Sequence, residues 1–422
     1  MDVEKRDLME IVSVPQAGAI SLEKAQENAQ PDAAPGVAAA SMLTAEVLPA
    51  VTYAENETAL PAQGYSPWRS LAPNWWTPYL EIDDQRTVLG LSTFGSDALD
   101  RHIFAATLAY DFENSITQGG VDYFYDGLWP ILHVGISRET SLTVDSNDNP
   151  VRVRAEDQLI LETIFPFLGQ RRNIFLHAAA VQETESDEWT NGVPPLADYH
   201  DDFAGTALRY DSSRLYPLSV SRSEGRDLRL IYEDTDLYGN SNRKGQVTVA
   251  EWREFFHIGR EHVLALRLTE GRGRNNPAPF RLGGIQDDDT VLSVLMAGET
   301  APLFNKRDYS LRGYSEGNAQ LVGTNMRLFS AEYRFPVARI EHGWMVPPVG
   351  VNQVHGTLFY DVGGVWDTGS GPADYYAGAG LEINADLDLF YNFRINASLG
   401  FATGLDDTLG EDKVYLRIGS HF

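Results

Sequence analysis

The sequence predicts an all-β protein, a transmembrane antiparallel β-barrel, on three observations. The last residues, 413–422, alternate between an apolar face and a polar face, as a strand does between lipid and a polar lumen. The chain ends on Phe422, and a terminal aromatic residue is common among bacterial outer-membrane barrels. From Tyr65 onward, further alternating runs of about ten residues are separated by polar turns.

The N-terminal part, residues 1–64, has a different composition. It is rich in Ala, Pro, Glu and Gln and poor in aromatic residues, which is typical of linkers. We therefore expect a largely extended periplasmic linker or the end of an upstream domain, followed by a barrel over residues 65–422. The first residues lack the apolar stretch of a signal peptide. Because an outer-membrane protein must be exported, we expect a fragment or a processed product.

Composition excludes several classes of site and partner. Cysteine is absent, so neither disulfides nor thiolate metal sites form. The net charge of −27 argues against nucleic acid as a partner. Acidic loops suit either divalent cations at a lipopolysaccharide surface or simple solubility, and composition does not separate the two.

The clearest runs predict strands in order along the chain. Residues 101–112, 262–268 and 389–401 each place apolar side chains on alternate positions. A helix would repeat every 3.6 residues instead. We interpret all three runs as strands with one face toward lipid.

The number of strands follows from parity. Direct counting finds fifteen, whereas single-chain bacterial barrels have an even number, with short periplasmic turns and long outer loops. The predicted connections are long at 138–151, 185–202, 237–245 and 272–320, and short at 168–170 and 258–260. Placing every long loop outside requires one more strand, which residues 75–82 supply. The prediction is a sixteen-stranded barrel with both ends at the periplasm.

Four motifs, taken together, indicate a resemblance to a known family. They are Phe-Arg-Leu-Gly-Gly at 280–284, Leu-Arg-Gly-Tyr-Ser at 311–315, Ser-Ala-Glu-Tyr-Arg-Phe-Pro at 330–336 and Phe-Tyr-Asp-Val-Gly at 359–363. This ordered set resembles the BamA-type outer-membrane barrel superfamily, the bacterial surface antigen domain. The resemblance covers residues 65–422. It implies that the sixth outer loop folds into the lumen and that its tip, Arg312, Gly313 and Tyr314, packs against acidic lumen residues.

The alternation of the flanking strands agrees with this expectation. It places Glu332 and Asp361 on inward faces of neighbouring strands. A guanidinium fork suits carboxylates, and a glycine permits close approach. We predict a plug-loop lock in which Arg312, beside Gly313, bonds to Asp361, Glu332 or both. The alternative is a lumen of solvated charges with a mobile loop.

The seam between the first and last strands is a second candidate site. Pro78 donates no ladder bond, and Gly419 weakens the terminal strand. Family members that insert proteins are thought to open at this seam, so Pro78, Gly419 and Phe422 are the residues of interest. The alternative is that Pro78 only ends the first strand outside the membrane.

No pattern indicates catalysis or a cofactor. The acidic stretch 234–239 resembles the start of a calcium loop, but Gly245 stands where the loop needs glutamate. The histidines lack metal spacing, and no nucleophile elbow is present. We therefore expect neither an enzyme nor a metal site.

The resemblance also implies a class of function. Typical members carry periplasmic POTRA modules, and residues 1–64 are too few for one. The arrangement is similar to barrels that follow a TolB-like propeller, which predicts a periplasmic protein partner or propeller-type domain. The leading hypothesis is protein insertion, translocation or surface export at the outer membrane, with a protein substrate. A structural anchor or scaffold barrel and a passive pore are the alternatives, and a soluble all-β enzyme leaves the apolar stripes unexplained.

Overall fold

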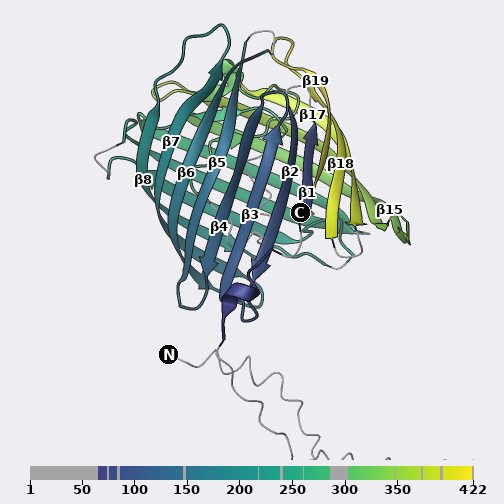
Figure 1. Ribbon diagram of the computed structural model, residues 1–422. Coiled ribbons are helices and arrows are strands. Elements are labelled where there is room, and N and C mark those ends of the chain that lie inside the picture. The colour runs from purple at the N-terminus through teal and green to yellow at the C-terminus, as the bar shows by residue number, and fades with distance from the viewer. Residues whose placement is uncertain are drawn as a thin grey trace, which may run out of the picture. The chain divides into compact units, whose positions relative to one another are not determined.

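The strands of this chain close into a single barrel. The computed structural model describes residues 65–422 apart from 74–75, 83–85, 146–148, 217, 238–240, 260, 286–302, 347, 372–373, 390–392 and 421–422. The expectation for residues 1–64 therefore lies outside the described residues. Figure 1 shows the first strands, in purple, beside the last strands, in yellow.

Sixteen antiparallel strands form the closed barrel, in the order β1 to β11 and then β15 to β19, with β19 paired to β1. The first eleven are β1 Thr77–Ile82, β2 Thr87–Ser96, β3 His102–Asp111, β4 Ile116–Tyr125, β5 Ile131–Val144, β6 Pro150–Phe167, β7 Asn173–Thr190, β8 Tyr199–Asp211, β9 Gly225–Asp234, β10 Gly245–Gly259 and β11 His262–Asn275. The last five are β15 Asn325–Trp344, β16 Val349–Trp366, β17 Tyr376–Leu389, β18 Phe393–Gly404 and β19 Asp412–Ser420. The predicted fold class and strand number are confirmed.

The remaining elements are short. β12 Phe280–Leu282, β13 Asp308–Tyr309 and β14 Val322–Gly323 form a three-stranded sheet within the connection from β11 to β15. Two 3-10 turns, η2 Pro67–Arg69 and η3 Ala319–Leu321, complete the order. Among the described residues, no helix is long and apolar enough to cross a membrane.

The alternation seen in the sequence separates the two faces of the wall. In β3, Leu108 and Tyr110 are exposed while Ala109 and Asp111 are buried. In β16, Leu358 and Tyr360 are exposed while Phe359 and Asp361 are buried. Since successive side chains of a strand point to opposite faces, the outer surface is apolar and the inner surface holds the charged residues.

Two of the four predicted long loops are shorter than expected because the hairpins extend. Residues 138–144 and 185–190 belong to β5 and β7, and β6 and β8 begin at Pro150 and Tyr199. These segments are mostly polar, which favoured loops in the sequence analysis, but their backbones keep pairing, for example Glu139 with Glu156. The connection from β9 to β10 is 235–244 and that from β11 to β15 is 276–324.

One predicted strand was misplaced. The run 389–401 contains the end of β17 at Leu389 and the start of β18 at Phe393, which pair with each other across the turn. The alternation continued through the turn by chance, and this hid the boundary. In β18, Leu399 and Phe401 are exposed as expected.

The main apolar cluster lies between the wall and the connection from β11 to β15. We call residues 276–324 the β11–β15 segment. Its Phe280, Leu311 and Tyr314 pack in one cluster with inward-facing Phe203 of β8 and Leu328 of β15. Burial of these side chains favours contact of the segment with β8, which precedes it in the chain, and with β15, which follows it.

Candidate functional site

Arg312 lies at the centre of a group of carboxylates. Its Nε donates to Asp361 Oδ2 at 2.7 Å and its Nη2 donates to Asp361 Oδ1 at 2.8 Å, a two-pronged contact. Nη2 also lies 2.9 Å from Glu332 Oε1. The guanidinium covers the ring of Phe359, with 3.6 Å between Cζ and the ring centroid. The structure thus brings Arg312 together with both carboxylates that the alternation pointed to.

The strands position these carboxylates by register. Asp361 stands opposite Ser330, and Glu332 opposite Phe359, so both acids point inward from adjacent strands. Asp361 is 1% exposed and Arg312 7% exposed. Burial alone would lower the pKa of Arg312, but Asp361 and Glu332 outweigh it and hold the pKa well above its ordinary value. These carboxylates therefore favour the charged form of Arg312.

The two residues after Arg312 contact the wall, Gly313 through its backbone and Tyr314 through its hydroxyl group. Gly313 has φ of +92°, and a Cβ there would lie 2.5 Å from the backbone nitrogen of Gly404 in β18. Its carbonyl accepts a hydrogen bond from the backbone N–H of Glu411 at 2.9 Å. The Tyr314 hydroxyl donates to the carbonyl of Ala377 in β17 at 2.8 Å. Gly313 and Tyr314 thus fasten the segment to β17 and β18.

Sequence reasoning missed a third carboxylate, Glu382 of β17. Its Oε1 lies 3.4 Å from Arg312 Nη1 and 3.4 Å from Arg417 Nη2. The hydroxyl of Tyr415 donates to the same oxygen. Both Tyr415 and Arg417 belong to the terminal strand β19. The signal that could have found it is the inward parity of Glu382 between two exposed apolar neighbours, Leu381 and Ile383.

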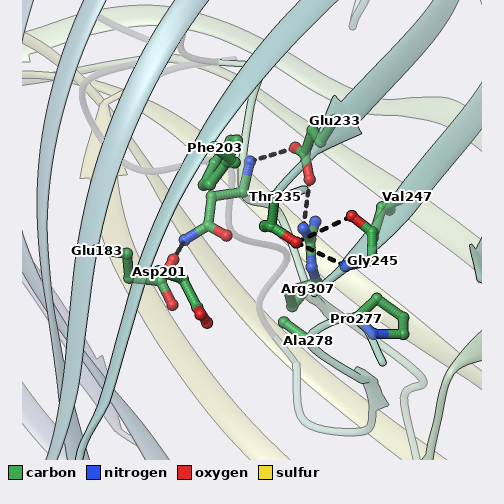
Figure 2. A pocket seen from close by; sticks show the side chains of 11 residues that line it. Glu183, Asp201, Phe203, Glu233, Thr235, Gly245, Val247, Pro277, Ala278 and Arg307 are labelled. Carbon is green, nitrogen blue, oxygen red and sulfur yellow. Dashed lines mark hydrogen bonds and ion pairs between the residues drawn. The ribbon is translucent and has the colours of Figure 1, made fainter. Parts of the chain in front are cut away.

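The β11–β15 segment makes a second set of polar contacts on the other side of the barrel. Figure 2 shows Arg307 pointing at Glu233 of β9, with an ion pair between them. The backbone N–H of Asn305 donates to Glu233 Oε1 at 2.7 Å, and its side chain donates to Glu183 of β7. Arg281 lies 2.7 Å from Glu156 of β6. None of these partners was predicted, because no motif pairs them in sequence.

The seam is the shortest pairing of the barrel among the described residues. β1 pairs with β19 at Leu80–Ile418, Glu81–Arg417 and Ile82–Leu416, three positions in all. By comparison, β1 pairs with β2 at six positions and β18 with β19 at nine. Pro78 pairs with Leu91 of β2 and has no place in the seam register.

Of the other two predicted seam residues, the structure describes only Gly419. Gly419 lies in β19 opposite Asn396 of β18. Phe422 lies outside the described residues. In the described register, Gly419 therefore pairs with β18 and not with β1. What does meet β1 is Arg417, opposite Glu81, and Arg417 also contacts Glu382.

A large cavity lies inside the barrel. Its volume is about 1110 Å³, and its lining includes wall residues of most strands together with residues 281–285, 303–306, 308–310, 312, 316 and 317. It reaches the turn after β6 and the turn after β8, which belong to the end of the barrel where β1 begins. The arrangement offers a polar interior, a tethered segment and a short seam.

Comparison with known proteins finds one matching family model and several solved structures with a similar fold. Residues 298–422 match the Omp85 superfamily domain. The BamA structure from Haemophilus ducreyi, lacking POTRA domains 1-3, is 11% identical with a TM-score of 0.56, covering 82% of this chain and 70% of that chain. CdiB from Escherichia coli is 12% identical with a TM-score of 0.58, covering 86% of this chain and 64% of that chain.

CdiB from Acinetobacter baumannii is 14% identical with a TM-score of 0.51, covering 81% of this chain and 59% of that chain. This chain therefore spans less than two thirds of either CdiB chain. No match was found among curated proteins. The domain match over residues 298–422 and the similarity in fold to BamA and CdiB agree with the predicted resemblance to the BamA-type superfamily.

Proposed function

We propose that this chain is an outer-membrane barrel that inserts, translocates or exports proteins together with a periplasmic partner. Both ends of the barrel chain face the periplasm, and the β11–β15 segment is the sixth outer loop, folded into the lumen as a plug. The Omp85 domain and the likeness of the barrel to BamA and CdiB support this class of function.

The observation that carries the proposal is the seam of three residue pairs. Each lost ladder hydrogen bond contributes only about 0.5–1.5 kcal/mol, so separating β1 from β19 costs far less than separating any neighbouring pair. An opened β19 presents unpaired backbone groups, which are a template for an incoming strand. A substrate strand can add there without disturbing the rest of the wall.

The plug contact connects to this seam through one side chain. Glu382 accepts from Tyr415 and contacts both Arg312 and Arg417. Movement of β19 therefore changes the surroundings of Arg312. In this mechanism Arg312, Gly313, Tyr314, Glu332 and Asp361 hold the plug while the seam opens and closes.

A disulfide across the seam tests the proposal. Leu80 and Ile418 stand opposite each other in β1 and β19, and the chain has no other cysteine. Leu80→Cys with Ile418→Cys should abolish substrate insertion or export in cells when oxidised, and reduction should restore it. The assay compares cells that depend on the variant with and without reductant.

The matched control keeps one of the two cysteines. Leu80 also stands opposite Leu89 of β2, so Leu80→Cys with Leu89→Cys links two strands that need not separate. This control should retain function when oxidised. Full activity of the oxidised seam variant would instead favour a scaffold barrel that holds a periplasmic complex and passes nothing.

A further inference from the structure

The outward face of the wall changes from apolar to basic toward the end of β11. The outward side chains of this strand are, in order, Leu264, Leu266, Leu268, Glu270, Arg272 and Arg274. On the neighbouring strand β15, exposed Phe329 stands opposite Leu268, and Arg327 stands opposite Glu270. The apolar stretch therefore ends at the same level on both strands. We call Arg272, Arg274 and Arg327, which lie just beyond it, the outer arginine patch.

Two members of the patch share one carboxylate. Arg272 Nε donates to Glu270 Oε1 at 2.7 Å, and Arg327 Nη2 donates to Glu270 Oε2 at 2.9 Å. Arg272 also covers the ring of Trp366 in β16, with 5.0 Å between Cζ and the ring centroid. Arg327 Nη1 donates to the hydroxyl of Tyr375 at 3.3 Å. These contacts fix the positions of both guanidinium groups on the outer surface.

The third member, Arg274, is exposed and stands apart from these contacts. Within the part of the chain that the structure describes, its side chain makes neither an ion pair nor a hydrogen bond. Gln246 stands opposite it in β10 and donates to Asp234 of β9 at 3.2 Å. Asp234 is 9% exposed and also accepts from the hydroxyl of Tyr232. The nearest acid on this side is thus buried and bound to neutral groups.

The stability of the fold does not account for the patch. The side chains of Arg272 and Arg327 are 46% and 40% exposed, and that of their shared partner Glu270 is 32% exposed. Ion pairs at this level of exposure contribute little to stability. A ligand outside the wall with negative charge explains the positions of all three arginines.

The basic character is local to this part of the wall. On β5, which runs in the same direction as β11, Arg138 follows exposed Ile136 on the outward face. Arg138 Nε donates to Asp157 of β6 at 2.8 Å, and its Nη2 lies 3.1 Å from Glu188 of β7. One arginine meets two carboxylates there, whereas two arginines meet one carboxylate on β11 and β15. The edge of the apolar face is therefore not basic everywhere.

We propose that the outer arginine patch binds the phosphates of lipopolysaccharide in the outer leaflet of the membrane. This inference rests on the proposed function, which directs the end of β11 away from the periplasm. The edge of the apolar outward face of a barrel lies at the level of the lipid headgroups. Guanidinium groups bind phosphate oxygens in a two-pronged manner that a lysine cannot reproduce.

The spacing of the patch favours lipopolysaccharide over a phospholipid. Successive outward residues of β11 lie about 7 Å apart, and β15 lies about 5 Å from β11. A phospholipid headgroup such as phosphatidylglycerol offers a single phosphate. The lipid anchor of lipopolysaccharide carries phosphate on both of its sugars, so one molecule reaches different members of the patch together.

Native mass spectrometry of the purified full chain in detergent tests the proposal. Rough-type lipopolysaccharide of defined mass is titrated, and each bound molecule appears as a discrete increase in mass. Arg272→Gln with Arg274→Gln should weaken binding about tenfold. The matching Lys substitutions keep the charge but lose the fork, so they should recover only part of the affinity.

Arg138→Gln is the matched control. The side chain of Arg138 is 45% exposed, as exposed as that of Arg272, and it occupies the corresponding place on β5. Arg138→Gln should leave binding unchanged. Arg274→Gln breaks no ion pair among the described residues, so it serves if the double variant does not fold by heat-modifiability, and it should weaken binding about threefold. No loss in a folded patch variant, or an equal loss in Arg138→Gln, overturns the proposal.

Three further probes separate the sources of phosphate. Lipopolysaccharide from which the phosphates have been removed should bind about tenfold more weakly. Phosphatidylglycerol should bind more weakly than lipopolysaccharide, and equally to the unaltered chain and the double variant. The proposal is overturned if phosphatidylglycerol binds as tightly as lipopolysaccharide, or if inorganic phosphate displaces lipopolysaccharide at similar concentration.

The seam disulfide experiment does not depend on lipid binding. If the oxidised seam blocks function while lipopolysaccharide binds independently of the patch, only the lipid site is wrong. If the patch binds lipopolysaccharide while the oxidised seam remains active, only the seam mechanism is wrong.

Discussion

Arg312 gathers carboxylates from three strands onto one guanidinium, and its removal leaves them buried together. Asp361 is 1% exposed and has both oxygens on Arg312. Breaking a buried pair by deleting one partner costs about 3–5 kcal/mol. We expect Arg312→Ala to lower barrel stability by that amount and to open the β11–β15 segment to protease, measured by heat-modifiability and limited proteolysis.

Two comparisons sharpen this prediction. Arg312→Lys keeps the charge but loses the fork, so it should recover only part of the stability. Arg226→Ala removes a side chain that is 51% exposed and pairs with Glu254, and it should have almost no effect. Wild-type stability of Arg312→Ala would mean that the segment is held by its apolar cluster alone.

Gly313 permits an approach that any side chain would prevent. Its φ of +92° is unfavourable for other residues, and a Cβ would lie 2.5 Å from the Gly404 nitrogen. Gly313→Ala should therefore cost about 2 kcal/mol or more, combining strain with displacement of β18. Heat-modifiability of the purified barrel measures the loss.

Gly192 provides the matched control. It has φ of +71°, but nothing lies within 4 Å of the position of an added Cβ. Gly192→Ala should cost only the strain, about 1 kcal/mol. Equal losses at the two glycines would show that the contact with β18 contributes nothing.

At the scale of elements, β15 changes its surroundings halfway along. From Asn325 to Arg334 it pairs with both β11 and β16, but beyond Arg334 it pairs with β16 alone as far as Trp344. Figure 1 labels this end of β15 at the right-hand side of the barrel. Residues 337–346 are all exposed.

This difference predicts two rates of amide exchange within one strand. Amides of residues 337–344 should exchange with deuterium much faster than those of residues 326–334, because local opening there breaks one ladder instead of two. Mass spectrometry of peptides from detergent-solubilised protein resolves the halves. Equal protection would indicate that another chain covers the free edge. Irregular register after Pro336 and after Arg339 helps keep that edge from pairing unspecifically.

The elements also show where sequence reasoning succeeds. Alternation depends on one residue at a time, so Glu332 and Asp361 were assigned to the correct face. Strand ends depend on backbone pairing, which polar residues such as those of 185–190 support as well as apolar ones do. Arg312 and Asp361 lie in two of the motifs that the family resemblance connects, which is why their contact could be predicted. Glu382, Glu233 and Glu183 have no such motif, and only the closed register brings them to the segment.

At the scale of the whole molecule, we expect the outer face of the wall to contact lipid and the inner face to contact water. Ile136 of β5 is 62% exposed on the outer face, and its neighbour Ser137 lines the cavity. A spin label on Ile136→Cys in lipid bilayers should collide with oxygen, which concentrates in lipid, and little with a water-soluble nickel complex. A label on Ser137→Cys should show the reverse. Similar collision rates at both positions would contradict a lipid-facing outer wall.

The partners of the β11–β15 segment have a consequence for the order in which the chain matures. Glu156, Glu183 and Glu233 precede the segment, while Glu332, Asp361 and Glu382 follow it. The segment can therefore settle only after strands on both sides of it have come together. A chain that stops before β16 has no Asp361 for Arg312 to bind. Seating of the segment thus reports that the barrel is complete, and a protease that cuts it would distinguish finished molecules from stalled ones.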